Sequence, residues 1–176
     1  MKSVLKKDKK YAVKKENKRI NKIIPLLINI MIPILAIILI GYINRNTLDT
    51  YRSLKGILVN EMVIIFPVGY GIIYILMGVS AYRIYMRNKS GVDDKGAYFT
   101  YFIQLCINFI WPFLFFTFRL YGLSFIWLII LLVAVLITFY KFFRVDKFSS
   151  ALLIPYIAWI VFISFLNYFI WFYNEM

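Results

Sequence analysis

The chain has 176 residues, of which 62% are apolar and 20% aromatic, and its mean hydropathy is +0.77. Soluble domains are about 45–50% apolar, so this composition argues against a soluble enzyme and excludes a disordered chain. The formal net charge is +13, histidine is absent and Cys106 is the one cysteine, so neither a metal site nor an intrachain disulfide is expected.

Five uncharged runs, each at least about 20 residues long, follow one another along the chain. A helix of that length crosses ~30 Å of hydrocarbon, and in lipid each segment must satisfy its own backbone hydrogen bonds. We therefore predict an all-α fold, an integral membrane bundle of five transmembrane helices. A basic tail at 1–22 precedes a membrane domain at 23–176, with helices expected at about 23–44, 62–86, 96–118, 120–143 and 148–174.

The tail and two of the connections carry most of the positive charge. Seventeen of the 21 Lys and Arg residues lie in the tail, between the second and third runs, or between the fourth and fifth. The other four are Arg45, Arg52, Lys55 and Arg119, at the opposite end of the bundle. The positive-inside rule then predicts a multi-pass cell-membrane protein with a cytoplasmic N-terminus and an outside C-terminus. We interpret the charge as a topology signal that contacts membrane lipids, not as a nucleic-acid site.

The second helix has one side rich in small and tyrosine residues. Gly71, Gly78 and Ala81 permit close approach of another helix. Tyr70 and Tyr74, one turn apart, are then expected to project their phenols into the bundle.

The third helix carries a polar and aromatic face. Gln104, Asn108, Trp111 and Phe115 recur at spacings of three and four residues, which places them on one side. One interpretation is that the amides are hydrogen-bonding contacts between helices. The other is that Asn108 and Trp111 line a cavity, and the sequence leaves both open.

The fifth helix has a similar stripe over a longer stretch. It contains Tyr156, Trp159, Ile163, Asn167, Ile170 and Asn174. Trp171 and Tyr173 lie near the end of the run and are expected in the interfacial aromatic belt. Three helices thus bring rings and amides together without a charge, which suits a large, flat, mostly apolar ligand better than an ion.

These stretches resemble the tryptophan-rich sensory protein or translocator protein (TspO/MBR) family. The similarity lies in residues 66–78, 104–116, 153–159 and 166–171, with Gln-x-x-x-Asn-x-x-Trp in the third helix and Pro-Tyr-x-x-Trp in the fifth. The resemblance implies a five-helix bundle that binds porphyrins in a pocket among the helices. Together with the stripe of the fifth helix, it gives the expected ligand-binding residues Tyr70, Tyr74, Asn108, Trp111, Trp159, Phe162, Ile163, Leu166 and Asn167.

The resemblance favours a membrane protein that binds porphyrin or tetrapyrrole-type ligands and transports or senses them. No catalytic residue, metal site or required cofactor is expected, and porphyrin is the expected ligand. Two alternatives stay open: light-dependent porphyrin degradation, and a structural or partner-binding membrane protein with a vestigial pocket. An enzymatic role is disfavoured, and a homodimer is left open.

Overall fold

The computed structural model describes the backbone of residues 2–45, 59–89 and 95–175. Within these ranges the chain is helical apart from short connections, and five helices are long and apolar enough to cross a membrane. The predicted all-α five-helix fold is therefore confirmed. The connection between the first two membrane helices, residues 46–58, lies outside the described residues.

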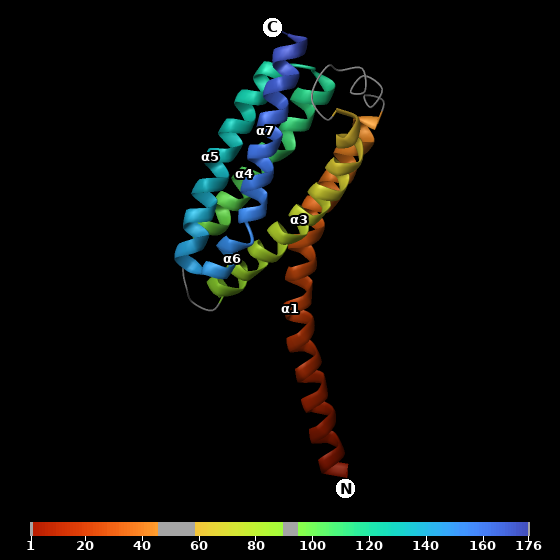
Figure 1. Ribbon diagram of the computed structural model, residues 1–176. Coiled ribbons are helices and arrows are strands. Elements are labelled where there is room, and N and C mark those ends of the chain that lie inside the picture. The colour runs from red at the N-terminus through yellow and green to blue at the C-terminus, as the bar shows by residue number, and fades with distance from the viewer. Residues whose placement is uncertain (1, 46–58, 90–94, 176) are drawn as a thin grey trace.

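The helices differ from the expected ranges mainly at their ends. The first, α1, spans Lys2–Ile43, so the basic tail is continuous with the first membrane helix and extends beyond the rest of the bundle (Figure 1). The others are α3 (Val59–Lys89), α4 (Lys95–Pro112), α5 (Tyr121–Val145), α6 (Lys147–Ala151) and α7 (Ile154–Asn174), with a π-helical turn, η2 (Phe113–Thr117), after α4.

Two groups of helices make up the bundle. α1 packs along α3, and α5 packs along both α4 and α7, while contacts between the two groups are sparser. In Figure 1, α3 meets the other helices near α6, and α3 and α1 diverge from α7 toward the end where the C-terminus lies.

A glycine sets the distance between α1 and α3. A Cβ atom at Gly78 would lie 2.7 Å from the Cα of Ile30 and 2.8 Å from the carbonyl oxygen of Asn29. That carbonyl lacks its usual helical donor, because Pro33 has no N–H group. Gly78 therefore lets the two backbones meet, as the small-residue side of the second helix predicts.

The short helix α6 closes the opposite end of the bundle. Asp146 caps it by accepting a hydrogen bond from the backbone N–H of Ser149, and it also receives one from Nε of Arg83 on α3 at 2.8 Å. Ser80 on α3 donates to the carbonyl oxygen of Ser149 at 2.6 Å. These contacts join α3 to the α5–α6 corner.

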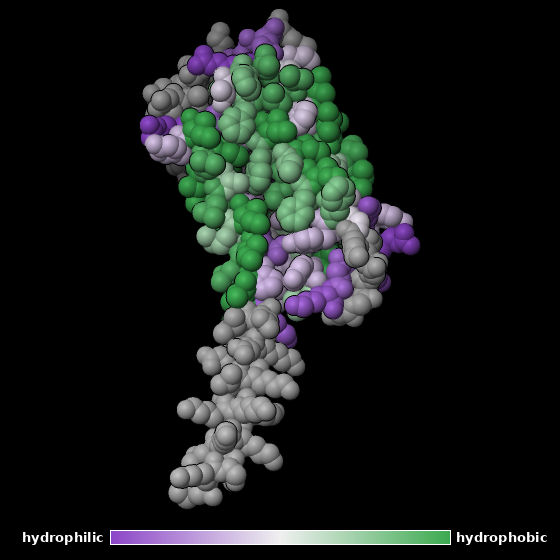
Figure 2. Space-filling model, turned by 180° about the vertical axis from the view of Figure 1, so that it is seen from behind, coloured by the Kyte–Doolittle hydropathy of each residue, from purple (hydrophilic) through white to green (hydrophobic). Residues whose placement is uncertain are grey.

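The outside of the bundle is apolar. Large hydrophobic side chains on every long helix are exposed, and a broad hydrophobic band covers the middle of the molecule, with polar residues gathered at its two ends (Figure 2). Cys106 is part of this exposed surface. An apolar exterior of this extent is the surface that a bilayer requires.

Candidate functional site

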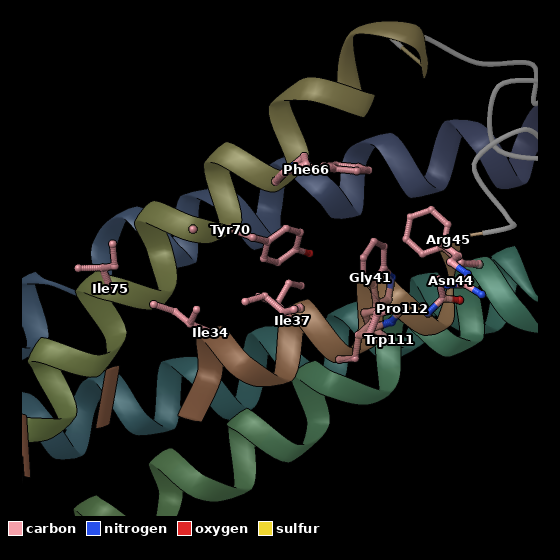
Figure 3. A pocket seen from close by; sticks show the side chains of 15 residues that line it. Ile34, Ile37, Gly41, Asn44, Arg45, Phe66, Tyr70, Ile75, Trp111 and Pro112 are labelled. Atoms are coloured by element: carbon pink, nitrogen blue, oxygen red, sulfur yellow. Dashed lines mark hydrogen bonds between the residues drawn. The ribbon is translucent and has the colours of Figure 1, made fainter. Parts of the chain in front are cut away.

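A cavity of about 550 Å³ lies among α1, α3 and the end of α4. Its volume falls within the range of ligand-binding pockets, roughly 300–1,000 Å³. Its lining includes the last turns of α1 (Figure 3), and this end of α1 lies away from α6 in Figure 1. It is lined by Ile34, Ile37, Ile38, Ile40, Gly41, Asn44, Arg45, Phe66, Pro67, Tyr70, Gly71, Ile75, Trp111, Pro112 and Phe116.

Two glycines keep part of this space open. A Cβ atom added at Gly41 on α1 or at Gly71 on α3 would meet no other atom within 4 Å. Neither glycine is therefore needed for close helix packing, in contrast to Gly78. The expectation that Gly71 permits helix contact is corrected here, since its missing side chain borders the cavity.

The end of α4 shapes the floor of the cavity. Pro112 cannot donate a backbone hydrogen bond, and the next five residues form the wider π-helical turn η2. The hydroxyl of Thr117 in this turn donates to Oδ1 of Asn44 at 2.7 Å. This bond holds the end of α1 against the end of α4.

Aromatic rings form much of the wall. Tyr70 projects from α3 with its hydroxyl directed toward the end of the cavity where Asn44 and Arg45 lie (Figure 3). Its ring is 6.3 Å from that of Phe66, and Trp111 faces the cavity from α4. Flat rings on two sides of an apolar space favour a ligand that can stack on them.

Among the described residues that line the cavity, the amide and charged side chains lie at one end. Asn44 and Arg45 lie at the end of α1, and the guanidinium carbon of Arg45 is 4.3 Å from the centre of the Tyr42 ring. The remaining lining is made of aliphatic, aromatic, glycine and proline residues. Asn44 is 7% exposed and uses its amide for the contacts with Thr117 and Ile40, so Arg45 is the group best placed to bind a polar substituent.

Tyr74 and Asn108 lie behind the cavity in a buried hydrogen-bond network. The Tyr74 hydroxyl donates to Oδ1 of Asn108 at 2.8 Å, and Nδ2 of Asn108 donates to the hydroxyl of Tyr156. All three residues are buried. The structure thus places Asn108 as a contact between α3, α4 and α7, which is the first of the two interpretations that the sequence left open.

Gln104, one turn before Asn108, is also buried but behaves differently. It is 1% exposed, and neither atom of its amide has a hydrogen-bond partner within the described part of the chain. The inward direction predicted for Gln104, Asn108, Trp111 and Phe115 is therefore confirmed, because all four are buried. A hydrogen bond between helices is found for Asn108 but not for Gln104.

Trp159 supports the cavity wall from α7 without lining the cavity. Its ring centre is 5.6 Å from that of Tyr70 in an edge-on arrangement and 6.4 Å from that of Phe66. It packs so closely against α3 that a Cβ atom at Gly69 would lie 2.3 Å from the indole. Phe162, one turn later, contacts Trp159 with ring centres 5.8 Å apart.

The other expected residues of α7 lie in the helix interface. Ile163 and Leu166 are buried in the core and do not border the cavity. Asn167 forms a hydrogen bond of 2.8 Å with Ser124 on α5. When the Asn167 amide is oriented so that both its oxygen and its nitrogen have hydrogen-bond partners, the oxygen also accepts a hydrogen bond from Nε1 of Trp111 at 3.2 Å. Asn167 can therefore orient a cavity residue from behind.

The structure brings only Tyr70 and Trp111, of the nine expected residues, to the cavity itself. The contribution that sequence reasoning missed comes from α1, above all Ile34, Ile37 and Gly41, together with Arg45. Apolar residues of α1 that face lipid and those that face the cavity have the same hydropathy, so no periodic signal separates them. The one available signal was the polar pair Asn44 and Arg45 at the end of the run.

Comparisons with known proteins agree with this architecture. Residues 29–172 match the model of the TspO/MBR family. The chain is 31% identical to protein CrtK of Rhodobacter capsulatus over 110 residues, which are 61% of this chain and 67% of the relative. It is also 31% identical to the human translocator protein, over 58% of this chain and 61% of that protein. It is 32% identical to the tryptophan-rich protein TspO of Archaeoglobus fulgidus, over 62% and 70% of the two chains.

Proposed function

This multi-pass membrane protein belongs to the TspO/MBR family, and from that premise we propose that its cavity binds a porphyrin or another flat tetrapyrrole-type ligand. The observation that carries the proposal is an apolar cavity with aromatic walls, which has Arg45 at one end as the cationic residue among its described lining. The bound ligand would be sensed by the bundle or passed across the membrane.

The lining favours a large ring system. Tyr70, Phe66, Trp111 and Phe116 offer aromatic surface to the cavity, and α1 adds isoleucine side chains. Stacking on such rings contributes about 0.5–1.5 kcal/mol per pair beyond the burial of apolar area. A flat macrocycle can use several of these contacts at once, whereas an ion would find no partner along most of the wall.

The position of Arg45 at one end of the cavity favours a ligand that carries an acidic substituent. A guanidinium group can donate two parallel hydrogen bonds to a carboxylate, and it stays charged at every physiological pH. A porphyrin with propionate side chains would place its ring between the aromatic walls and its carboxylate at Arg45. If the N-terminus is cytoplasmic, as the charge distribution predicts, this end of the cavity faces outward.

The proposal is tested by titrating purified full-length protein in detergent with metal-free protoporphyrin and following porphyrin absorbance. We expect saturable binding to wild type, weakened at least about fivefold by Arg45→Gln. Arg119→Gln, which removes a charge expected on the same side but outside the cavity, should leave it unchanged. The dimethyl ester of the porphyrin should bind both Arg45 forms equally. Absence of saturable binding to wild type would overturn the proposal.

The same complex separates binding from light-dependent degradation. Trp159 contacts Tyr70, which lines the cavity, so oxidisable rings lie next to the expected ligand position. For a binding protein, bound porphyrin should bleach under illumination no faster than porphyrin in detergent alone. Protein-dependent bleaching that saturates with the binding curve would instead assign the degrading activity.

A further inference from the structure

A second hollow lies on the outer face of α5, in the half of that helix next to α6 and away from the ligand cavity. It is a shallow groove of about 450 Å³ lined by Val133, Leu136, Ile137, Tyr140, Lys141 and Arg144. We call it the α5 groove. Its three aliphatic residues and Tyr140 are 46–61% exposed, so nothing within the described part of the chain covers them.

The groove has the length of one half of a bilayer. Val133 and Arg144 are eleven residues apart, which at a rise of about 1.5 Å per residue is roughly 16 Å. The hydrocarbon core of a bilayer is about 30 Å thick, so one leaflet accounts for about half of that. The groove as a whole, from Val133 to Arg144, therefore has about the depth of one leaflet. Its aliphatic residues cover about 6 Å of that depth within the acyl layer, with Tyr140 near the boundary with the headgroups.

Two cations stand at the headgroup end of the groove. Lys141 and Arg144 are not within ion-pair distance of any carboxylate in the part of the chain that the structure describes. The nearby carboxylate of Asp146 instead pairs with Arg83 at 2.8 Å and with Arg87 at 3.8 Å. Arg144 lies over the ring of Tyr140, with its guanidinium carbon 6.0 Å from the ring centre.

This end of α5 is also the end at which most of the chain's positive charge is gathered. By the positive-inside rule it faces the cytoplasmic leaflet, which is the leaflet richer in anionic lipids. Basic pockets on this side of transmembrane helices are suited to acidic lipid headgroups. The groove thus combines an apolar track, an interfacial tyrosine and two cations that pair with no carboxylate of the described residues, in the order in which a phospholipid presents their counterparts.

We propose that the α5 groove is a binding site for one anionic phospholipid, with an acyl chain along Val133, Leu136 and Ile137 and the phosphate group between Lys141 and Arg144. A second copy of this chain fits the groove less well. A twofold-symmetric contact centred on the groove would bring Lys141 and Arg144 close to the same cations of the partner. The lipid has the opposite charge and the required length.

The test uses full-length protein in detergent and native mass spectrometry to count bound lipids. The probes are phosphatidylglycerol and phosphatidylcholine with the same acyl chains. We expect wild type to retain the first phosphatidylglycerol at least threefold more strongly than phosphatidylcholine. The double variant Lys141→Gln, Arg144→Gln should lose this preference, while the charge-conserving variant Lys141→Arg, Arg144→Lys should keep it.

A matched control separates a specific site from general charge attraction. Lys9→Gln with Lys10→Gln removes two positive charges from the tail and should leave the preference unchanged. An equal loss in both double variants would overturn the proposal, as would equal retention of the two lipids by wild type. Soluble glycerophosphate should fail to displace the lipid, and displacement at millimolar concentration would assign a phosphate site without a lipid track. Cross-linking of two copies of the chain to each other through position 136 would instead assign the groove to a second copy.

Discussion

Tyr70 is the residue at which the cavity meets the aromatic contacts behind it. One side of its ring borders the cavity, and its other neighbours are Trp159 and Tyr74, whose ring centres are each 5.6 Å away. Trp159 is in turn packed on the backbone of α3 at Gly69. A change in the Trp159 indole should therefore alter the position of Tyr70, although Trp159 itself does not line the cavity.

We predict that Trp159→Phe weakens porphyrin binding about threefold to fivefold, because the smaller ring leaves space beside Tyr70 and Phe66. Trp171→Phe should change binding by less than about twofold, since Trp171 stacks on Phe125 of α5 and does not line the cavity. Titration with protoporphyrin measures both effects. Thermal melting in detergent shows whether either variant is generally destabilised. A larger loss for Trp171→Phe at equal stability would contradict this account.

The contacts between elements depend on a few specific atoms. At the crossing of α1 and α3, the backbone of Asn29 and Ile30 occupies the space where a side chain of residue 78 would lie. Gly78→Ala should therefore force the two helices apart at a cost of about 1–3 kcal/mol, the usual range for overpacking.

Gly71→Ala is the matched control, because its added methyl group meets no atom within 4 Å. Thermal melting should show a lower midpoint for Gly78→Ala and little change for Gly71→Ala. Equal midpoints for the two variants would mean that the helices cross differently from the arrangement described here.

The α3–α6 contact predicts a dependence on pH. Burial disfavours the charged form of Asp146, but hydrogen bonds from Arg83 and Ser149 outweigh this and lower its pKa below the usual value. A carboxyl group whose folded pKa is lowered stabilises the protein above its unfolded pKa, about 4, and this stabilisation is lost as the pH falls through the lower folded value.

Asp146→Asn should consequently reduce the melting temperature at pH 7, and the difference from wild type should shrink as the pH falls below about 4. Asparagine can still cap α6, so the variant removes the charge and leaves the cap. Melting curves across this pH range provide the measurement. A difference that stays constant with pH would show that the Asp146 charge is not what stabilises the corner.

The elements themselves were largely predictable, because a membrane helix must be long, uncharged and bounded by polar residues. The inward face of α4 was also predictable, since polar side chains such as Asn108 avoid lipid. The cavity was only partly predictable. Asn167 has the same polar character as a ligand contact but pairs with Ser124, and Ile34 and Ile37 look no different in sequence from lipid-facing Leu35 and Leu39. Whether each of these residues borders the cavity depends on its position in the bundle, which the sequence pattern does not encode.

At the scale of the whole molecule, charge asymmetry predicts how the bundle is oriented. The start of α1, the C-terminal end of α3 and the α5–α6 corner lie toward one end of the molecule (Figure 1). The ligand cavity is lined by the last turns of α1, which lie toward the other end. The α5 groove and the ligand cavity would then lie at the depths of opposite leaflets of the membrane.

Reporter fusions after Lys89 and after Met176 test this orientation. We expect a cytoplasmic signal from the first and an external signal from the second, because three further spans separate the two positions. The control is a fusion at the N-terminus, which should match Lys89. The same signal from Lys89 and Met176 would contradict five crossings.

The central claim is that the space among α1, α3 and α4 is the ligand site. Neighbouring positions on α3 test it directly, since Gly71 borders the cavity whereas Ile72 is 57% exposed on the outer surface. Protoporphyrin affinity should be measured for Gly71→Phe, which places a ring in the cavity, and for Ile72→Phe, which places it in lipid. We predict at least a tenfold loss for Gly71→Phe and less than a twofold change for Ile72→Phe, with similar melting temperatures. Unchanged affinity in Gly71→Phe would show that the ligand binds elsewhere.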